Sequence, residues 1–258
     1  MKRIFNLTIL PWLVLGCGGI GLAFRGLMYA TAVDDKGLLI SGNLPNILTW
    51  VLTALVAAGL LVILWKPTGS NRYADNFHAS IPSAAGSFLA AAGILVTLLA
   101  GMGPIMDGLT KLCLITGFLS VPCLIIAALC RLKDKQPLFL FHAVFCVFLA
   151  LHLANQYRIW SGEPQLSDYG FQLFASICLM LTAYHRCTFD AGLGQRRSLL
   201  FCGLMAVYLC CLAMIKADTP LLYLTGGIWA FTNLCTPEPS PRRPREIKST
   251  DAPPEEAV

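Results

Sequence analysis

Charged residues are scarce in this chain of 258 residues, of which only 13% are Asp, Glu, Lys or Arg. A soluble domain carries about 25% charged residues. Hydrophobic residues make up 56% of the chain and fall in runs of about 20 residues, the length that a helix needs to cross a bilayer. This composition excludes an ordinary soluble domain and indicates an integral membrane protein in contact with the lipid bilayer.

The sequence also lacks the motifs of common catalytic sites. It contains no HExxH, GxSxG or P-loop pattern, and no two acidic residues fall in one apolar run. No CxxC motif is present, and most of the eleven cysteines lie in apolar runs, which argues against a disulfide framework. We therefore expect no enzymatic activity and no bound cofactor, with haem and zinc kept as alternatives.

Eight apolar runs predict eight transmembrane helices, because a helix satisfies its own backbone hydrogen bonds in hydrocarbon. The predicted spans cover residues 10–31, 47–65, 81–101, 109–129, 138–154, 169–184, 198–215 and 221–234. We thus expect an all-α, polytopic helical bundle over residues 1–235, with close helix packing at Gly86 and Gly93. Residues 236–258 are rich in proline and charge, and they predict a disordered tail.

The positive charges alternate between the two sides of the predicted bundle. Fourteen of the nineteen Lys and Arg residues fall at the two termini and in every second loop, and five fall on the other side. The positive-inside rule then places both termini in the cytoplasm. Because these charges sit beside spans rather than on one folded face, nucleic-acid binding is excluded. A bacterial plasma membrane is the expected location, with protein partners at the cytoplasmic loops and tail.

Polar residues gather on the predicted outer side of the membrane. Arg25 lies inside the first span, and an ionisable residue in a span is a candidate functional residue. Arg25, His152, Asn155, Gln156 and Asp168 together form a candidate solute or ligand site. The alternative is structural: Arg25 extends to the interface or pairs with Asp107, Glu163 or Asp168, and the other residues form an interfacial belt.

A second group of candidates could bind a metal ion or haem on the predicted cytoplasmic side. His142, His185 and Cys187 have the ligand chemistry that zinc or haem iron prefers, and Cys130 and Cys235 end neighbouring spans. The spacing is not that of a known metal motif. The alternative is that the histidines form hydrogen bonds between helices and that the cysteines pack as small apolar residues.

The sequence supports three hypotheses for function, in a stated order. The first is a membrane sensor, regulatory subunit or scaffold that acts through partners, since the loops are short and few polar residues lie within spans. The second is a permease or transport subunit for a small solute, built around the outer polar residues and a kink at Pro122. The third is a membrane haem or redox protein.

Overall fold

The computed structural model describes residues 2–31, 43–65, 73–103, 107–162 and 169–235 of the chain. Within these residues all regular secondary structure is helical. In chain order the helices are α1 (Lys2–Thr31), α2 (Leu44–Ile63), α3 (Tyr73–Asn76), α4 (Ile81–Ala100), α5 (Gly108–Leu132), α6 (Phe139–Trp160), α7 (Gly170–Asp190), α8 (Arg196–Ala213) and α9 (Pro220–Cys235). A long helix covers each of the eight apolar runs, and α3 is one additional turn. The predicted tail, 236–258, lies outside the described residues.

Three helices run beyond the predicted ends of their spans. They end at Leu132, Trp160 and Asp190, whereas the apolar runs end near residues 129, 154 and 184. The additional turns carry polar side chains that are buried against neighbouring helices, among them Arg131 and Arg186. Apolar composition therefore locates these helices but underestimates their length.

Local sequence signals account for several helix starts. Proline occupies the first turn of α2 and α4 and begins α9, where its missing N–H group costs no hydrogen bond. The side chain of Ser80 caps α4 by accepting a hydrogen bond from the backbone N–H of Ser83 at 3.3 Å. These starts agree with the prolines that punctuate the sequence.

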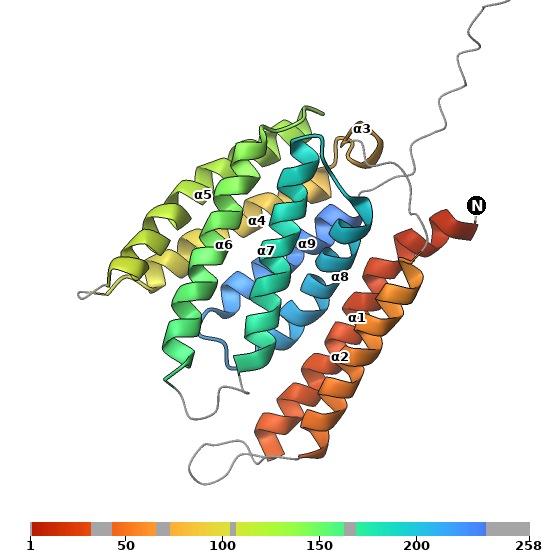
Figure 1. Cartoon of the computed structure of the whole chain (residues 1–258), viewed down its shortest axis with the longest axis vertical. Helices are drawn as coiled ribbons and strands as arrows, with labels where there is room; N and C mark the ends of the chain where they lie inside the picture. Colours follow the sequence, from red (N-terminus) through yellow and green to blue (C-terminus); the bar gives the residue numbers. More distant parts are fainter. Residues whose placement is uncertain (1, 32–42, 66–72, 104–106, 163–168, 236–258) are drawn as a thin grey trace, which may run out of the picture.

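Six helices form a closed ring (Figure 1). Each of α4, α5, α6, α7, α8 and α9 packs against the next, and α9 returns to α4. In Figure 1, α5, α6 and α7 form the nearer layer, and α4, α9 and α8 lie behind them. Helices α1 and α2 pair outside the ring, where α1 packs against α8.

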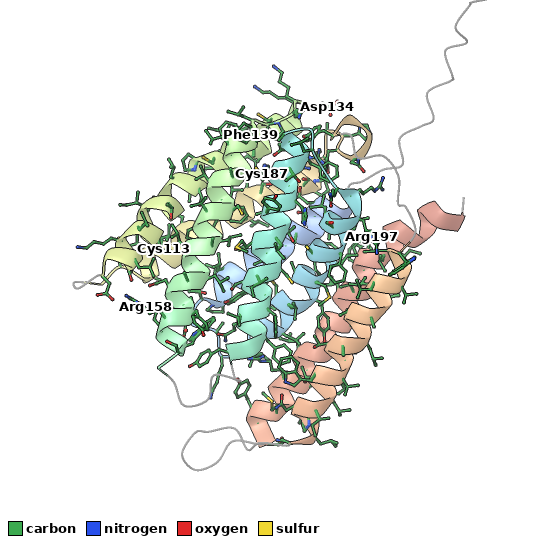
Figure 2. The ribbon with its side chains drawn as sticks, viewed as in Figure 1. Cys113, Asp134, Phe139, Arg158, Cys187 and Arg197 are labelled. Atoms are coloured by element: carbon green, nitrogen blue, oxygen red, sulfur yellow. The ribbon has the colours of Figure 1, made fainter. Side chains whose placement is uncertain are left out.

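The two ends of the bundle differ in their chemistry. The α3 end is where α2, α5, α7 and α9 finish and where α4, α6 and α8 begin. The other is called the opposite end. Figure 2 shows Asp134 and Arg197 at the α3 end and Arg158 at the opposite end.

The exterior of the bundle is strongly apolar. Six helices (α1 from Ile9, α2, α4, α5, α6 and α8) are long and apolar enough to cross a membrane. On α2, the least buried of them, Leu55 is 65% exposed and Val62 is 75% exposed. Soluble monomers rarely expose apolar surface on this scale. An all-helical bundle with this exterior is compatible with a multi-pass membrane protein.

Small residues allow α4 and α9 to approach closely enough to close the ring. Gly93 of α4 faces Thr225 of α9, and Gly86 faces Thr232. A Cβ atom added at Gly93 would lie 2.7 Å from Cβ of Thr225, closer than such atoms pack. The two glycines therefore act as sites of close helix approach, as their spacing predicts.

We predict that Gly93→Ala destabilises the protein, because the new methyl group overlaps the short Thr225 side chain. The expected cost is about 1–3 kcal/mol, the usual range for overpacking. The measurement is the thermal unfolding midpoint of the purified protein in detergent. Gly59→Ala on α2 is the control, since a Cβ there meets no described atom within 4 Å. Equal midpoints for the two variants would contradict the proposed close contact.

Candidate functional site

Two arginine side chains are buried at the α3 end of the bundle. Arg131 lies on the last turn of α5 and is 4% exposed, and Arg186 lies near the end of α7 and is 2% exposed. Asp190 follows Arg186 by one turn, and His142 lies on the first turns of α6. These four residues and Phe77, which directly follows α3, are called the arginine cluster.

Phe77 packs against both arginines. The Cζ atom of Arg186 lies 3.6 Å from the centroid of the Phe77 ring, and that of Arg131 lies 4.8 Å away. Arg186 also lies 5.3 Å from the ring of Tyr73 on α3. Phe77 in turn meets Phe189 edge to face at 5.3 Å. Because a desolvated cation–π contact contributes about 2 kcal/mol, Phe77 ties the α3 segment to α5 and α7.

Asp190 connects α6 to α7. Its Oδ2 atom lies 2.5 Å from Nδ1 of His142, and its Oδ1 atom lies 3.8 Å from Nη2 of Arg186. Gln136 donates a hydrogen bond of 2.6 Å to the backbone carbonyl of Asp190. The Asp190 side chain is completely buried, so its charge acts on these neighbours without screening by water.

A chain of hydrogen bonds extends the cluster to α4 and α9. Nε of Arg131 donates to Oγ of Ser83 at 3.4 Å, and this hydroxyl donates to Oδ1 of Asn233 at 2.9 Å. The amide of Asn233 donates to the carbonyl of Trp229 at 2.8 Å. Five of the six ring helices therefore contribute to one buried polar network.

Arg186 retains donors that have no acceptor. Within the part of the chain that the structure describes, its Nε and Nη1 atoms have no hydrogen-bond partner, and neither does Oδ1 of Asp190. Leaving a buried polar group unsatisfied costs about 1–3 kcal/mol, and a charged group costs more. Packing alone does not account for such an arrangement, which marks the cluster as a candidate functional site.

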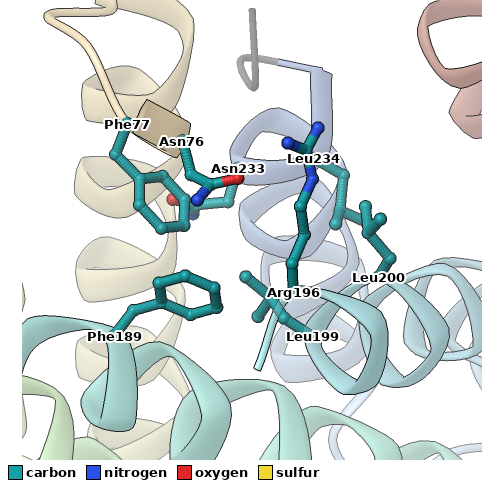
Figure 3. Close-up of a pocket in the computed structure, with 8 residues that line it drawn as sticks. All are labelled: Asn76, Phe77, Phe189, Arg196, Leu199, Leu200, Asn233 and Leu234. Atoms are coloured by element: carbon teal, nitrogen blue, oxygen red, sulfur yellow. The ribbon is translucent and has the colours of Figure 1, made fainter. Parts of the chain in front are cut away.

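A small cavity lies beside the arginine cluster (Figure 3). Its lining residues are Asn76, Phe77, Phe189, Arg196, Leu199, Leu200, Asn233 and Leu234. Its free volume is about 10 Å³, which is room for about one water molecule. Figure 3 shows Arg196 of α8 on the side of the cavity away from Phe77 and Phe189. Phe77 belongs to both the cavity wall and the arginine cluster.

At the opposite end, Arg25 is buried between α1 and α7. It is 1% exposed, and its Cζ atom lies 4.8 Å from the ring of Phe171 and 5.7 Å from that of Tyr29. Of its predicted carboxylate partners, Asp107 forms an exposed pair with Arg158 at 2.6 Å. The other two, Glu163 and Asp168, lie outside the described residues.

The other residues of the predicted solute site share α6. His152, Asn155 and Gln156 are all buried, and Oδ1 of Asn155 accepts a hydrogen bond from Thr110 at 3.2 Å. Among the described residues, Nε2 of His152 and Oε1 of Gln156 have no hydrogen-bond partner. Burial and unsatisfied atoms are compatible with a solute site, which stays a prediction.

The residues predicted to bind metal or haem do not come together. His142 belongs to the arginine cluster, and His185 packs against its neighbour Tyr184. The thiol of Cys187 donates to the carbonyl of Phe139 at 3.3 Å, and Figure 2 shows these two residues near the α3 end. In the described ranges no group of three or more His, Cys, Asp or Glu side chains is placed to hold a metal ion.

Sequence analysis missed the roles of Arg131 and Arg186. Both are counted there as loop charges that orient the spans, and this is wrong because both lie on helices and are buried. The sequence did hold a signal. Gly192, with a φ of 80°, follows α7 in the position that commonly ends a helix, and a helix that reaches it places Arg186 and Asp190 four residues apart on one face.

Comparison of the chain with protein-family models, with curated proteins and with solved structures gave no match. The functional argument therefore depends on the contacts of the arginine cluster and on the arrangement of the helices around it.

We predict that Asp190→Asn lowers stability by about 3–5 kcal/mol, the usual loss when one partner of a buried ion pair is removed. Asparagine preserves the volume but leaves Arg186 and His142 without a carboxylate. Unfolding of the purified protein by heat or denaturant measures the effect. The matched control is Asp107→Asn, whose carboxylate is 64% exposed and whose loss should cost less than about 1 kcal/mol. Equally small losses would show that Asp190 is not the counter-ion of Arg186.

Proposed function

We propose that the chain is an eight-span protein of the plasma membrane that acts as a sensor or regulatory subunit, with the docked α3 segment as its switch. The observation that carries this proposal is the contact of Phe77 with Arg131 and Arg186. One side chain from a single helical turn rests on charged groups of two ring helices. Its position therefore depends on how α5 and α7 sit relative to each other.

The ring supports eight spans, although α7 and α9 are less apolar or shorter than the other long helices. The polar residues of α7, including Gln172 and Arg186, are buried inside the bundle, where neighbouring helices shield them from lipid. Helix α9 has 16 residues, or about 24 Å of helix, and a bilayer adapts to such a shortfall by local thinning. Removing either helix would open the ring.

Exposed charge supports a cytoplasmic location for the α3 end. Lys133, Lys135 and Arg197 are exposed there, and the described part of the opposite end has Lys111, Arg158 and Lys216. The many further basic residues of the sequence belong to segments that adjoin the α3 end, which favours this orientation by the positive-inside rule. The exposed Lys133, Lys135 and Arg197 would attract an acidic surface of a protein partner.

Transport is the second candidate function, and one observation favours it. Buried polar residues lie at both ends of the ring, with the arginine cluster at one end and His152 and Gln156 at the other. Phe145, Phe148 and Trp229 fill the ring as fully buried aromatic side chains, at most 1% exposed. Alternating access would require these side chains to move. The closed packing favours the sensor over the permease.

The topology predicts that a cytoplasm-active reporter works when fused after Cys235 or after Leu193 in the α7–α8 connection. A reporter that is active only outside the cytoplasm should work when fused after Lys216, between α8 and α9. Activity of both fusions in whole cells is the measurement. If Leu193 and Lys216 report the same side, α8 does not cross the membrane and the eight-span arrangement is wrong.

The switch predicts that Phe77→Ala changes the recovery of a partner. Loss of the ring removes the contacts that dock the α3 segment, so the α3 end should present a different surface. The measurement is in-cell crosslinking, followed by affinity capture in mild detergent and mass spectrometry. We expect a stoichiometric partner with the wild type and at least a threefold change in its recovery with Phe77→Ala, about 0.7 kcal/mol in affinity.

Phe118→Ala is the matched control, since Phe118 lies on α5 and is 39% exposed. Its partner recovery should equal that of the wild type. A protein that is captured only with itself, in all three forms, would overturn the sensor proposal and would move the permease ahead of it.

A further inference from the structure

We infer that the arginine cluster binds a phosphate-type oxyanion through Arg186, with Phe77 and the α3 segment as its cover. The ligand is either a free phosphate group or the headgroup of an anionic lipid. This inference rests on the proposed sensor function for its consequence, since oxyanion binding would be the event that the α3 segment reports. The binding itself can be tested without a partner.

The open donors of Arg186 are the first argument. Its side chain is 3% exposed, yet within the described residues Nε and Nη1 have no hydrogen-bond partner. A guanidinium has five N–H donors and no acceptor, so only an acceptor-rich group can satisfy these atoms. Arginine binds phosphate and carboxylate oxygens more strongly than neutral acceptors, because the hydrogen bonds are charge-assisted.

The way Phe77 contacts Arg186 leaves these donors available. A cation placed over an aromatic ring interacts through its face, whereas N–H groups of a guanidinium point outward in its plane. The 3.6 Å separation from Phe77 fills the face and does not use the N–H groups. An oxyanion can therefore bind at the edge of Arg186 while Phe77 remains in contact.

The charges around Arg186 favour an anion. Arg131 is a second buried cation in contact with the same Phe77 ring, and Arg196 lines the neighbouring cavity. The opposing charge is Asp190, whose Oδ1 lies 3.8 Å from Nη2 of Arg186, outside hydrogen-bonding distance. Its Oδ2 is engaged by His142 at 2.5 Å. The carboxylate is thus held mainly by the imidazole and leaves Arg186 incompletely neutralised.

The cavity beside Phe77 gives a direction of access. Arg196 is half-buried at its wall, and Phe77 separates the cavity lining from Arg186 by one side chain, since it belongs to both groups. The present volume of about 10 Å³ is too small for a phosphate group. Binding therefore requires Phe77 to shift, which couples the ligand to the docking of the α3 segment.

Calorimetric titration of the full-length protein in neutral detergent with inorganic phosphate tests the inference, with chloride at matched ionic strength as the reference. We expect saturable binding with a Kd below about 1 mM, corresponding to about −4 kcal/mol. Arg186→Lys retains the charge but loses the planar donors, and it should bind at least about tenfold more weakly. Arg158→Lys, at the exposed pair of the opposite end, should bind as the wild type does.

Hydrogen exchange of the wild type provides a readout that does not depend on the folding of any variant. Phosphate should change the exchange of residues 73–77 and of the last turn of α7, with the same midpoint as the titration. A lipid source predicts this change in nanodiscs containing phosphatidic acid but not in phosphatidylcholine alone, together with no heat from free phosphate. Either pattern supports the inference.

The inference is overturned if neither phosphate nor phosphatidic acid changes exchange at the α3 segment, or if chloride gives the same response. It is also overturned if folded Arg186→Lys binds as tightly as the wild type. Partner capture decides the sensor proposal separately. Phosphate binding with no partner would leave the site in place and refute the sensor.

Discussion

Burial of two arginine side chains inside a bundle with an apolar exterior is the constraint on which the rest of this structure depends. A guanidinium away from water is costly unless charged or aromatic groups surround it. Asp190, His142, Phe77 and Ser83 supply those groups, and they come from four different segments of the chain. The network cannot form unless the ring closes and the α3 segment docks, so one end of the bundle links packing to charge.

The same constraint explains why the middle and the ends of the ring differ. In the middle, small residues and buried aromatic side chains pack without polar partners, as at Gly93 and Phe148. The ends carry the polar groups, with His152 and Gln156 at one end and the arginine cluster at the other. A bundle divided in this way can change at one end while its centre remains packed. This property suits a protein that reports a bound ligand.

Long apolar runs made the helices predictable, because each run is the part of a helix that meets hydrocarbon. The candidate site was harder to predict, since Arg131 and Arg186 follow the ends of their runs and resemble ordinary loop charges. Phe77 gave no signal at all, because a four-residue helix has no periodicity to detect. The contact between α4 and α9 joins residues far apart in the sequence, and only the folded ring shows which small residues face each other. The solute site predicted around Arg25 and His152 stays a prediction.

Closure of the ring by its first and last helices has a consequence for how the protein is made. Helix α4 is complete at Ala100, and α9 begins only at Pro220. At about 5–20 residues per second, the glycine face of α4 waits on the order of ten seconds after its synthesis before its partner exists. During that interval Ser83 also lacks Asn233, and Arg131 lacks a completed network. A message truncated before α9 would therefore yield a bundle with an open groove, which membrane quality control could recognise by its exposed polar residues.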